Sequence, residues 1–215
     1  MKNVFTIFTS PGETFERIRG SKAAWILPTI LAIIMSLVSI ALQMPYLLDF
    51  TRETWLKMGN IDPAQIEQML GMTVVTSYVG AVIGIIFMVF LIALLLVLLN
   101  LIVRGEGKYM QFVSVAAYAG LPTAIGTLLT SVLLVAMDAK SLGDVSLSLG
   151  ALVADKTGMM YKILSLVNPF SIWGLYLYVV GAAIMMQRPR KKIAIWIVAV
   201  WVIYSLIMIF TAPAV

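Results

Sequence analysis

Five long stretches of this chain are strongly apolar and contain no Asp, Glu, Lys or Arg. A helix of about 20 predominantly apolar residues is long enough to cross the hydrocarbon core of a bilayer. Backbone groups must be hydrogen-bonded internally within lipid, so runs of this length are expected to be helical. The predicted fold is therefore an all-α polytopic membrane protein with five transmembrane helices. Their approximate ranges are 23–44, 74–103, 112–137, 168–186 and 193–210.

A single five-helix transmembrane domain, residues 23–215, accounts for most of the chain. The preceding segment, residues 1–22, contains "SPGETFERI", in which Ser10 is a candidate N-cap and Glu13 stands at the third helical position of a capping box. The apolar face of this segment is narrow and is flanked by cations. We interpret residues 1–22 as a cytoplasmic amphipathic lead-in, which either contacts anionic lipid or a partner, or only orients the first span.

The charges of the loops predict the orientation of the chain. The N-terminal segment and the loops at 104–111 and 187–192 lie on one side and carry ten of the fifteen Lys and Arg residues. Cytoplasmic loops are enriched in these residues, so we expect the N-terminus in the cytoplasm and the C-terminus outside. The net charge of +5 then reports topology and does not indicate a nucleic-acid partner. The predicted cytoplasmic basic edge consists of Arg104, Lys108, Arg188, Arg190, Lys191 and Lys192.

The residue types that most catalysis requires are missing from the predicted spans. The chain has no Cys and no His, which removes thiolate nucleophiles, imidazole bases and the commonest metal ligands. Ionisable side chains within a bilayer usually mark proton relays or catalytic sites, and the five stretches have none. We therefore expect a protein that is not an enzyme and that uses no cofactor or metal ion.

The polar residues that remain in the five stretches carry hydroxyl or amide groups. Side chains of this kind most often form hydrogen bonds between membrane helices. They also line solute paths in channels and transporters, so both interpretations stay open. The residues are Ser36, Ser39, Gln43, Thr76, Ser77, Asn100, Ser114, Thr123, Thr127, Thr130, Ser131 and Ser205.

Small residues recur at a spacing of four in the second and third stretches. Gly80 and Gly84 form one such ridge, and Ala116, Gly120 and Ala124 form another. Ridges of small residues allow two helix backbones to approach closely. We expect both ridges to pack helices of this chain against one another, with dimerisation as the alternative.

The loop "RGEGKYM", residues 104–110, has the glycines and the lysine of a phosphate-binding turn. A Walker-type loop requires G-x-x-x-x-G-K-[ST] between a strand and a helix. Here the spacing of Gly105 and Gly107 is wrong, and Tyr109 stands where Ser or Thr is needed. An apolar helix precedes the loop in place of a strand. We expect no bound nucleotide and interpret the loop as a tight turn.

Three short motifs occur in a fixed order along the chain. They are "SPGETFERI" before the first span, "FVSVAAYAGLP" after the tight turn, and "NPFSIWGLYLYVVGAA" at the start of the fourth span. In order and spacing they resemble the Yip family (Ypt/Rab-interacting-protein type) of five-span membrane proteins. The residues of the central motif are Gly105, Gly107, Tyr118 and Pro122.

The resemblance has consequences for localisation and partners. Eukaryotic members of this family act in vesicle traffic and bind Rab-type GTPases through a long cytoplasmic N-terminal region. The N-terminal segment here is short and is similar to that of bacterial members. The resemblance thus implies a non-enzymatic multi-pass protein of the bacterial inner (plasma) membrane, and some bacterial relatives accompany ABC-type exporters.

These observations lead to one expected function and two alternatives. The expected function is that of a scaffold or accessory protein, which binds and modulates another membrane protein such as an ABC-type exporter. Its partners would be the lipid bilayer and another integral membrane protein, either an exporter or a second copy. The alternatives are a small-solute channel or transporter, and a lipid-organising protein in which the cluster "QRPRKK" binds acidic head groups.

Overall fold

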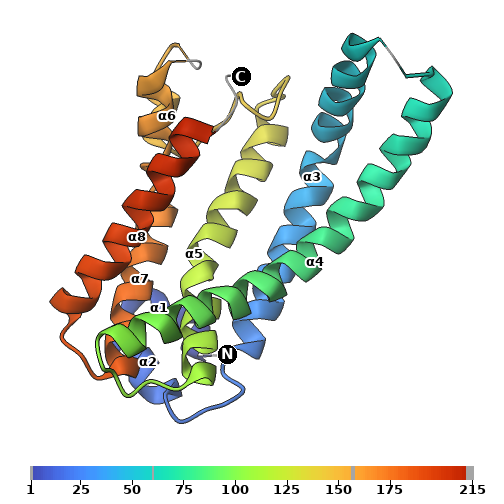
Figure 1. Cartoon of the computed structure of the whole chain (residues 1–215). Coiled ribbons are helices and arrows are strands. Elements are labelled where there is room, and N and C mark those ends of the chain that lie inside the picture. The colour runs from blue at the N-terminus through green and yellow to red at the C-terminus, as the bar shows by residue number, and fades with distance from the viewer. Residues whose placement is uncertain (1, 60, 156–157, 212–215) are drawn as a thin grey trace.

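A computed structural model describes residues 2–59, 61–155 and 158–211, and Figure 1 shows how its helices are arranged. The described residues form no β-strand, so the all-α prediction is confirmed. Five helices are long and apolar enough to cross a membrane, which confirms the predicted number of spans. They are α3 (Ile26–Met58), α4 (Pro63–Ile102), α5 (Tyr109–Ala136), α7 (Pro169–Met186) and α8 (Arg190–Thr211).

Helices α3 and α4 are longer than the apolar stretches that predicted them. They contain 33 and 40 residues, whereas a bilayer requires about 20, so part of each helix lies beyond the hydrocarbon core. Gly59 ends α3 in the left-handed conformation, with a φ of 69° that glycine adopts without steric cost. Asp62 is the N-cap of α4, and its side chain accepts a hydrogen bond of 2.8 Å from the amide of Ala64.

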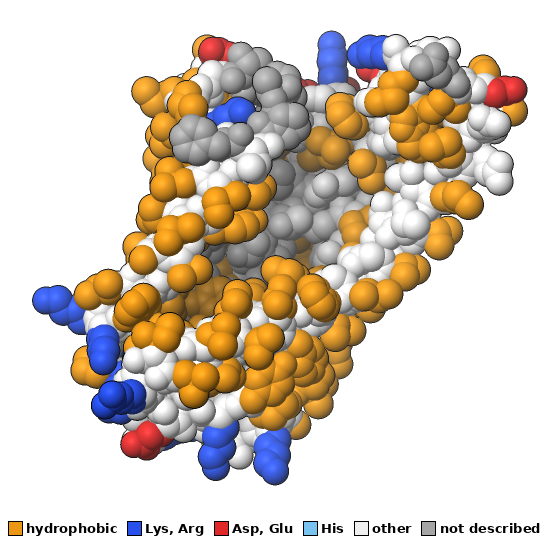
Figure 2. All heavy atoms as spheres, viewed as in Figure 1, with side chains coloured by type: hydrophobic (Ala, Val, Ile, Leu, Met, Phe, Trp, Pro, Cys, Tyr) orange, Lys and Arg blue, Asp and Glu red, His pale blue; other side chains and the backbone are white. Residues whose placement is uncertain are grey.

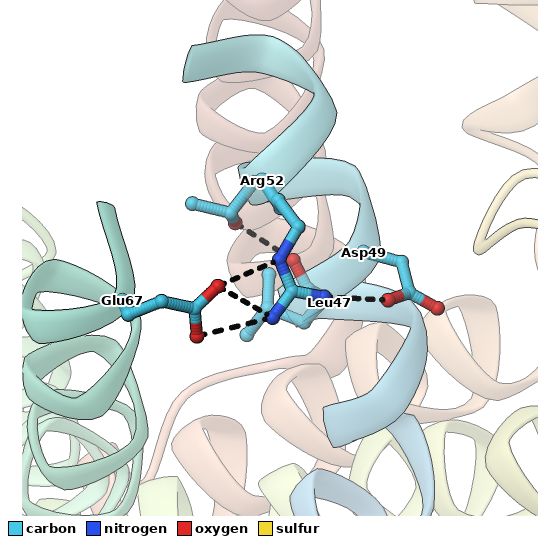
Figure 3. A network of polar contacts seen from close by, with 5 residues as sticks. Leu47, Asp49, Arg52 and Glu67 are labelled. Carbon is cyan, nitrogen blue, oxygen red and sulfur yellow. Dashed lines mark hydrogen bonds and ion pairs between the residues drawn. The ribbon is translucent and has the colours of Figure 1, made fainter. Parts of the chain in front are cut away.

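A small ion-pair network joins the extended ends of α3 and α4 (Figure 3). Arg52 of α3 donates from Nη2 to Oε1 of Glu67 in α4 at 3.0 Å, and its Nη1 lies 3.7 Å from Asp49. All three side chains are exposed for at least 43% of their surface. Ion pairs this exposed contribute about 0–1 kcal/mol each, so the network orients the two ends more than it stabilises them.

Helix α5 occupies the centre of the bundle, between the α3–α4 pair and the α7–α8 pair (Figure 1). Residues 112–119 of α5 are all buried and form a large part of the core. Helix α8 packs mainly on α7. The outward faces of the spans are apolar and exposed, as Figure 2 shows along the flank of the molecule. Lipid tails are as apolar as these side chains, so such faces are stable within a membrane.

The chain before the first span forms two helices that pack on the bundle, α1 (Lys2–Thr9) and α2 (Pro11–Ile18). Ser10 is the N-cap of α2 but makes no side-chain cap hydrogen bond, so the predicted capping box with Glu13 is wrong. Each of the two helices has buried side chains, and the role of residues 1–22 as an amphipathic lead-in stays a prediction. Their buried side chains are Ile7, Thr14, Phe15 and Ile18.

Both basic turns lie with α1 and α2 at one end of the bundle, which we call the basic end (Figures 1 and 2). It comprises α1, α2, residues 103–108 and residues 187–192. The opposite end holds the 3-10 helix η1 (Leu149–Leu152), the short helix α6 (Met159–Ser165) and the end of α8. The loops that the charge pattern placed on one side are thus together in space. That this end faces the cytoplasm stays a prediction.

Candidate functional site

The turn between α4 and α5 is held by its own backbone and by Asn100. The Gly105 amide donates to the Asn100 carbonyl at 2.8 Å, and the Gly107 amide donates to the Asn100 side-chain Oδ1 at 3.1 Å. Between them, the Glu106 amide donates to the Met186 carbonyl at the end of α7, also at 3.1 Å. A phosphate-binding nest needs successive free amides. These three are already used inside the protein, in agreement with the interpretation as a turn.

Glycine is required at positions 105 and 107 because a side chain would not fit there. The backbone conformation does not require it. The residue of the turn with a positive φ is Arg104, at 56°, and neither glycine has one. A Cβ atom on Gly105 would lie 2.8 Å from the Cβ of Met186, and a Cβ on Gly107 would enter the ring of Phe112. Distances below about 3 Å force a neighbour to move, and both neighbours here are buried. The turn therefore packs tightly against α5 and α7.

Phe15 fixes α2 to the basic end. Its ring is fully buried and lies edge-on to the ring of Tyr118 in α5, with centroids 6.3 Å apart. Gly181 of α7 makes room for it, because a Cβ there would lie 2.8 Å from the Phe15 ring and 2.9 Å from Val115. Tyr118 thus contacts α2, and the next motif residue along α5, Pro122, is also buried.

The basic edge divides into one restrained arginine and five exposed cations. Arg188 reaches the end of α4, where its Nε donates to the Val103 carbonyl at 3.2 Å and its Nη2 donates to the Arg104 carbonyl. The last carbonyls of a helix lack intrahelical partners and carry partial negative charge, so the guanidinium caps α4. The exposed members of the edge are Arg104, Lys108, Arg190, Lys191 and Lys192.

A cavity of about 350 Å³ lies within the membrane-spanning region, between α3, α4 and α5. Its α5 wall contains the predicted ridge of Ala116, Gly120 and Ala124. A Cβ atom on Gly120 would meet no other atom within 4 Å. Ala116 is buried, but the middle of the ridge faces open space and has no close helix partner in the described part of the chain.

The ridge in α4 is also open. A Cβ atom on Gly80 or Gly84 would meet nothing within 4 Å among the described residues. Within the described residues, no other helix comes close enough to use these two glycines, so the structure gives no support to their packing helices of this chain together. The alternative, contact with a second copy, stays a prediction.

Close packing between α5 and α7 uses other glycines, which the spacing-four pattern did not reveal. A Cβ on Gly174 would lie 2.9 Å from the Ala119 carbonyl oxygen, and a Cβ on Gly126 would lie 2.8 Å from the ring of Phe170. Gly174 and Gly181 are seven residues apart, which places them on one face of α7 two turns apart. This seven-residue spacing is the signal in the sequence that could have identified the packing face.

Most polar side chains of the spans bond to their own helix. Gln43 is an exception, because its Nε2 donates to the Ser131 hydroxyl at 2.5 Å and links α3 to α5. Hydroxyls that bond to the preceding turn are satisfied without water, which favours structural roles over a polar solute path. The hydroxyls that donate to the carbonyl four residues earlier belong to Ser39, Thr76, Ser77, Ser114, Thr127, Thr130 and Ser131.

The fold defines a class of protein: an integral membrane protein with five spans, whose N-terminal helices and two basic turns meet at one end. The family model of the Yip1 domain matches residues 5–212, so the chain belongs to the Yip1 family and the predicted family is confirmed. A relative, the membrane protein YknW of Bacillus subtilis (strain 168), is 26% identical over 212 residues, which cover 97% of this chain and 88% of the relative. No solved structure matches the chain.

Proposed function

We propose that this protein is a non-enzymatic scaffold or accessory subunit of the bacterial plasma membrane. It binds a transmembrane helix of another integral membrane protein, such as an ABC-type exporter, and modulates that protein. The observation that carries the proposal is the open ridge of α5 around Gly120. In membranes, small-residue ridges allow a second helix to pack at close range. No helix in the described part of the chain packs closely against the ridge at Gly120.

The walls of the cavity support a helix as its occupant. Small residues of α5 face larger ones of α4, among them Met88 and Ile92, so the cavity offers both a close approach and apolar side-chain contacts. Thr123 and Thr127 lie on the same α5 wall. Hydroxyl groups at such positions form hydrogen bonds across helix interfaces in membranes.

Co-purification tests this proposal. Isolated from native membranes at native expression in a mild detergent, the wild-type chain is expected to carry another integral membrane protein in fixed stoichiometry, identified by mass spectrometry. Changing Gly120 and Ala124 together to Leu fills the cavity beside the α5 ridge with side chains. Overpacking costs about 1–3 kcal/mol, so the amount of partner recovered is expected to fall about tenfold or more.

The matched control places the same two leucines elsewhere. Ala41 and Ala199 lie on exposed faces of α3 and α8, and their change to Leu is expected to leave the partner bound. A wild-type chain that purifies alone contradicts the accessory role. Equal recovery of partner by all variants shows that the partner does not bind at the α5 ridge. Recovery of a firmly held lipid without protein favours the lipid-organising alternative.

A further inference from the structure

A second cavity, of about 430 Å³, opens at the basic end between α2 and the turn from α7 to α8. Three arginines line it: Arg19 just after α2, Arg188 in the turn, and Arg190 at the start of α8. Arg19 is far from the other two in sequence. The docking of Phe15 on α7 brings the end of α2 beside the turn, so the three side chains converge because of the fold.

The charge of this cavity is positive. Glu16 is the one carboxylate among its described lining residues, and none of the three arginines forms an ion pair with a described carboxylate. Arg188 is restrained by its bonds to the end of α4. Helix α8 begins at Arg190 and directs the positive end of its dipole toward the same space. Guanidinium groups bind phosphate oxygens strongly and in a defined geometry, so the cavity is suited to a phosphate group.

Part of the cavity wall is apolar and belongs to a membrane span. Ala183 and Ile184, in the last turns of α7, form part of it. The cavity therefore stands where a span meets the membrane interface, at the depth of lipid head groups. A molecule with a phosphate group joined to acyl chains matches both the arginines and the apolar wall, whereas inorganic phosphate matches only the arginines.

We propose that this cavity binds the phosphate group of an anionic phospholipid, whose acyl chains lie along α7. Topology alone accounts for an excess of cations at a cytoplasmic end, but it does not require Arg19 and Arg190 to face one cavity. The site is separate from the ridge around Gly120 and does not depend on a partner helix there.

The test is a titration of purified protein in mild detergent with phosphatidylglycerol, with bound lipid counted by native mass spectrometry. Each cation near a membrane surface strengthens the binding of anionic lipid roughly fivefold. The double variant R19Q/R190Q is therefore expected to bind phosphatidylglycerol about thirtyfold more weakly. The control K191Q/K192Q removes the same charge from two neighbouring side chains that do not line the cavity. It is expected to lose less than about threefold, because charges that do not contact the bound phosphate are screened by salt.

Equal losses in the two double variants would overturn the proposal, since they indicate a diffuse surface charge. Equal affinity of the wild type for phosphatidylcholine would overturn it as well. Displacement of the lipid by glycerol 3-phosphate at matching concentration would assign the cavity to a soluble phosphate ester instead of a lipid. If R19Q/R190Q does not fold, the single variants R19Q and R190Q decide the question, each with an expected loss of about fivefold.

Discussion

Replacement of Gly107 by Ala is expected to destabilise the protein by about 3 kcal/mol, the upper part of the usual range for overpacking. The added Cβ would enter the ring of Phe112, which is fully buried at the start of α5 and has no space to move aside. For a chain of this size the loss corresponds to a fall in the melting temperature of roughly 6–12 °C. Thermal unfolding in mild detergent, followed by circular dichroism, measures it.

Gly84 provides the matched control for this change. Gly84 is also a glycine and lies within the span α4, but a Cβ there would meet no atom within 4 Å. Its change to Ala is expected to leave the melting temperature unchanged or slightly raised, because Ala favours helix by about 1 kcal/mol over Gly. A Gly107→Ala variant as stable as Gly84→Ala contradicts the tight packing of the turn on α5.

Replacement of Phe15 by Ala is expected to release α2 from the bundle. Removing a buried aromatic side chain costs about 3–5 kcal/mol, and we expect a loss of about 3 kcal/mol here. The docked α2 keeps Arg17 and Arg19 in a folded segment, where trypsin cuts slowly. Cleavage that follows local opening is expected to accelerate by about two orders of magnitude. Timed proteolysis in detergent, read by mass spectrometry, measures the rate.

Phe5 is the control for Phe15. It lies in α1, is 73% exposed, and its change to Ala is expected to alter the cleavage rate by less than about twofold, as for other exposed positions. If trypsin cuts both variants at the wild-type rate, Phe15 does not hold α2 in place. The convergence of Arg19 with the other two arginines then loses its structural basis.

The number of spans was predictable because length and apolarity alone decide whether a segment can cross a bilayer. The N-terminal helices were not predictable in this way. "NVFTIF", from Asn3 to Phe8, carries no charge, yet it is too short to span and was indistinguishable from a loop. Its Ile7 is fully buried. Burial of so short a helix depends on long-range packing: α1 packs on α2, and Phe8 lies against Trp173 of α7 with ring centroids 6.4 Å apart.

At the candidate sites too, features that depend on neighbouring residues were predictable, and features that depend on packing between distant segments were not. The turn at Gly105 and Gly107 was predictable from local glycine content, although the reason for the glycines is the position of Phe112 and Met186. The role of Arg19 was not predictable, because it requires the packing of α2 on α7. The openness of the ridge at Gly120 was not predictable either. The four-residue spacing of small residues shows that a helix can approach closely, but it does not show which helix does so.

The accessory role and the head-group site both assume a chain that crosses the membrane five times with its basic end in the cytoplasm. The chain contains no cysteine, so single-cysteine variants report sidedness without background. Glu106 at the basic end and Lys140 at the opposite end are both exposed, and each is changed to Cys. In intact cells, a membrane-impermeant maleimide is predicted to label Lys140→Cys, and to label Glu106→Cys only after permeabilisation. Labelling of Glu106→Cys in intact cells would contradict this orientation.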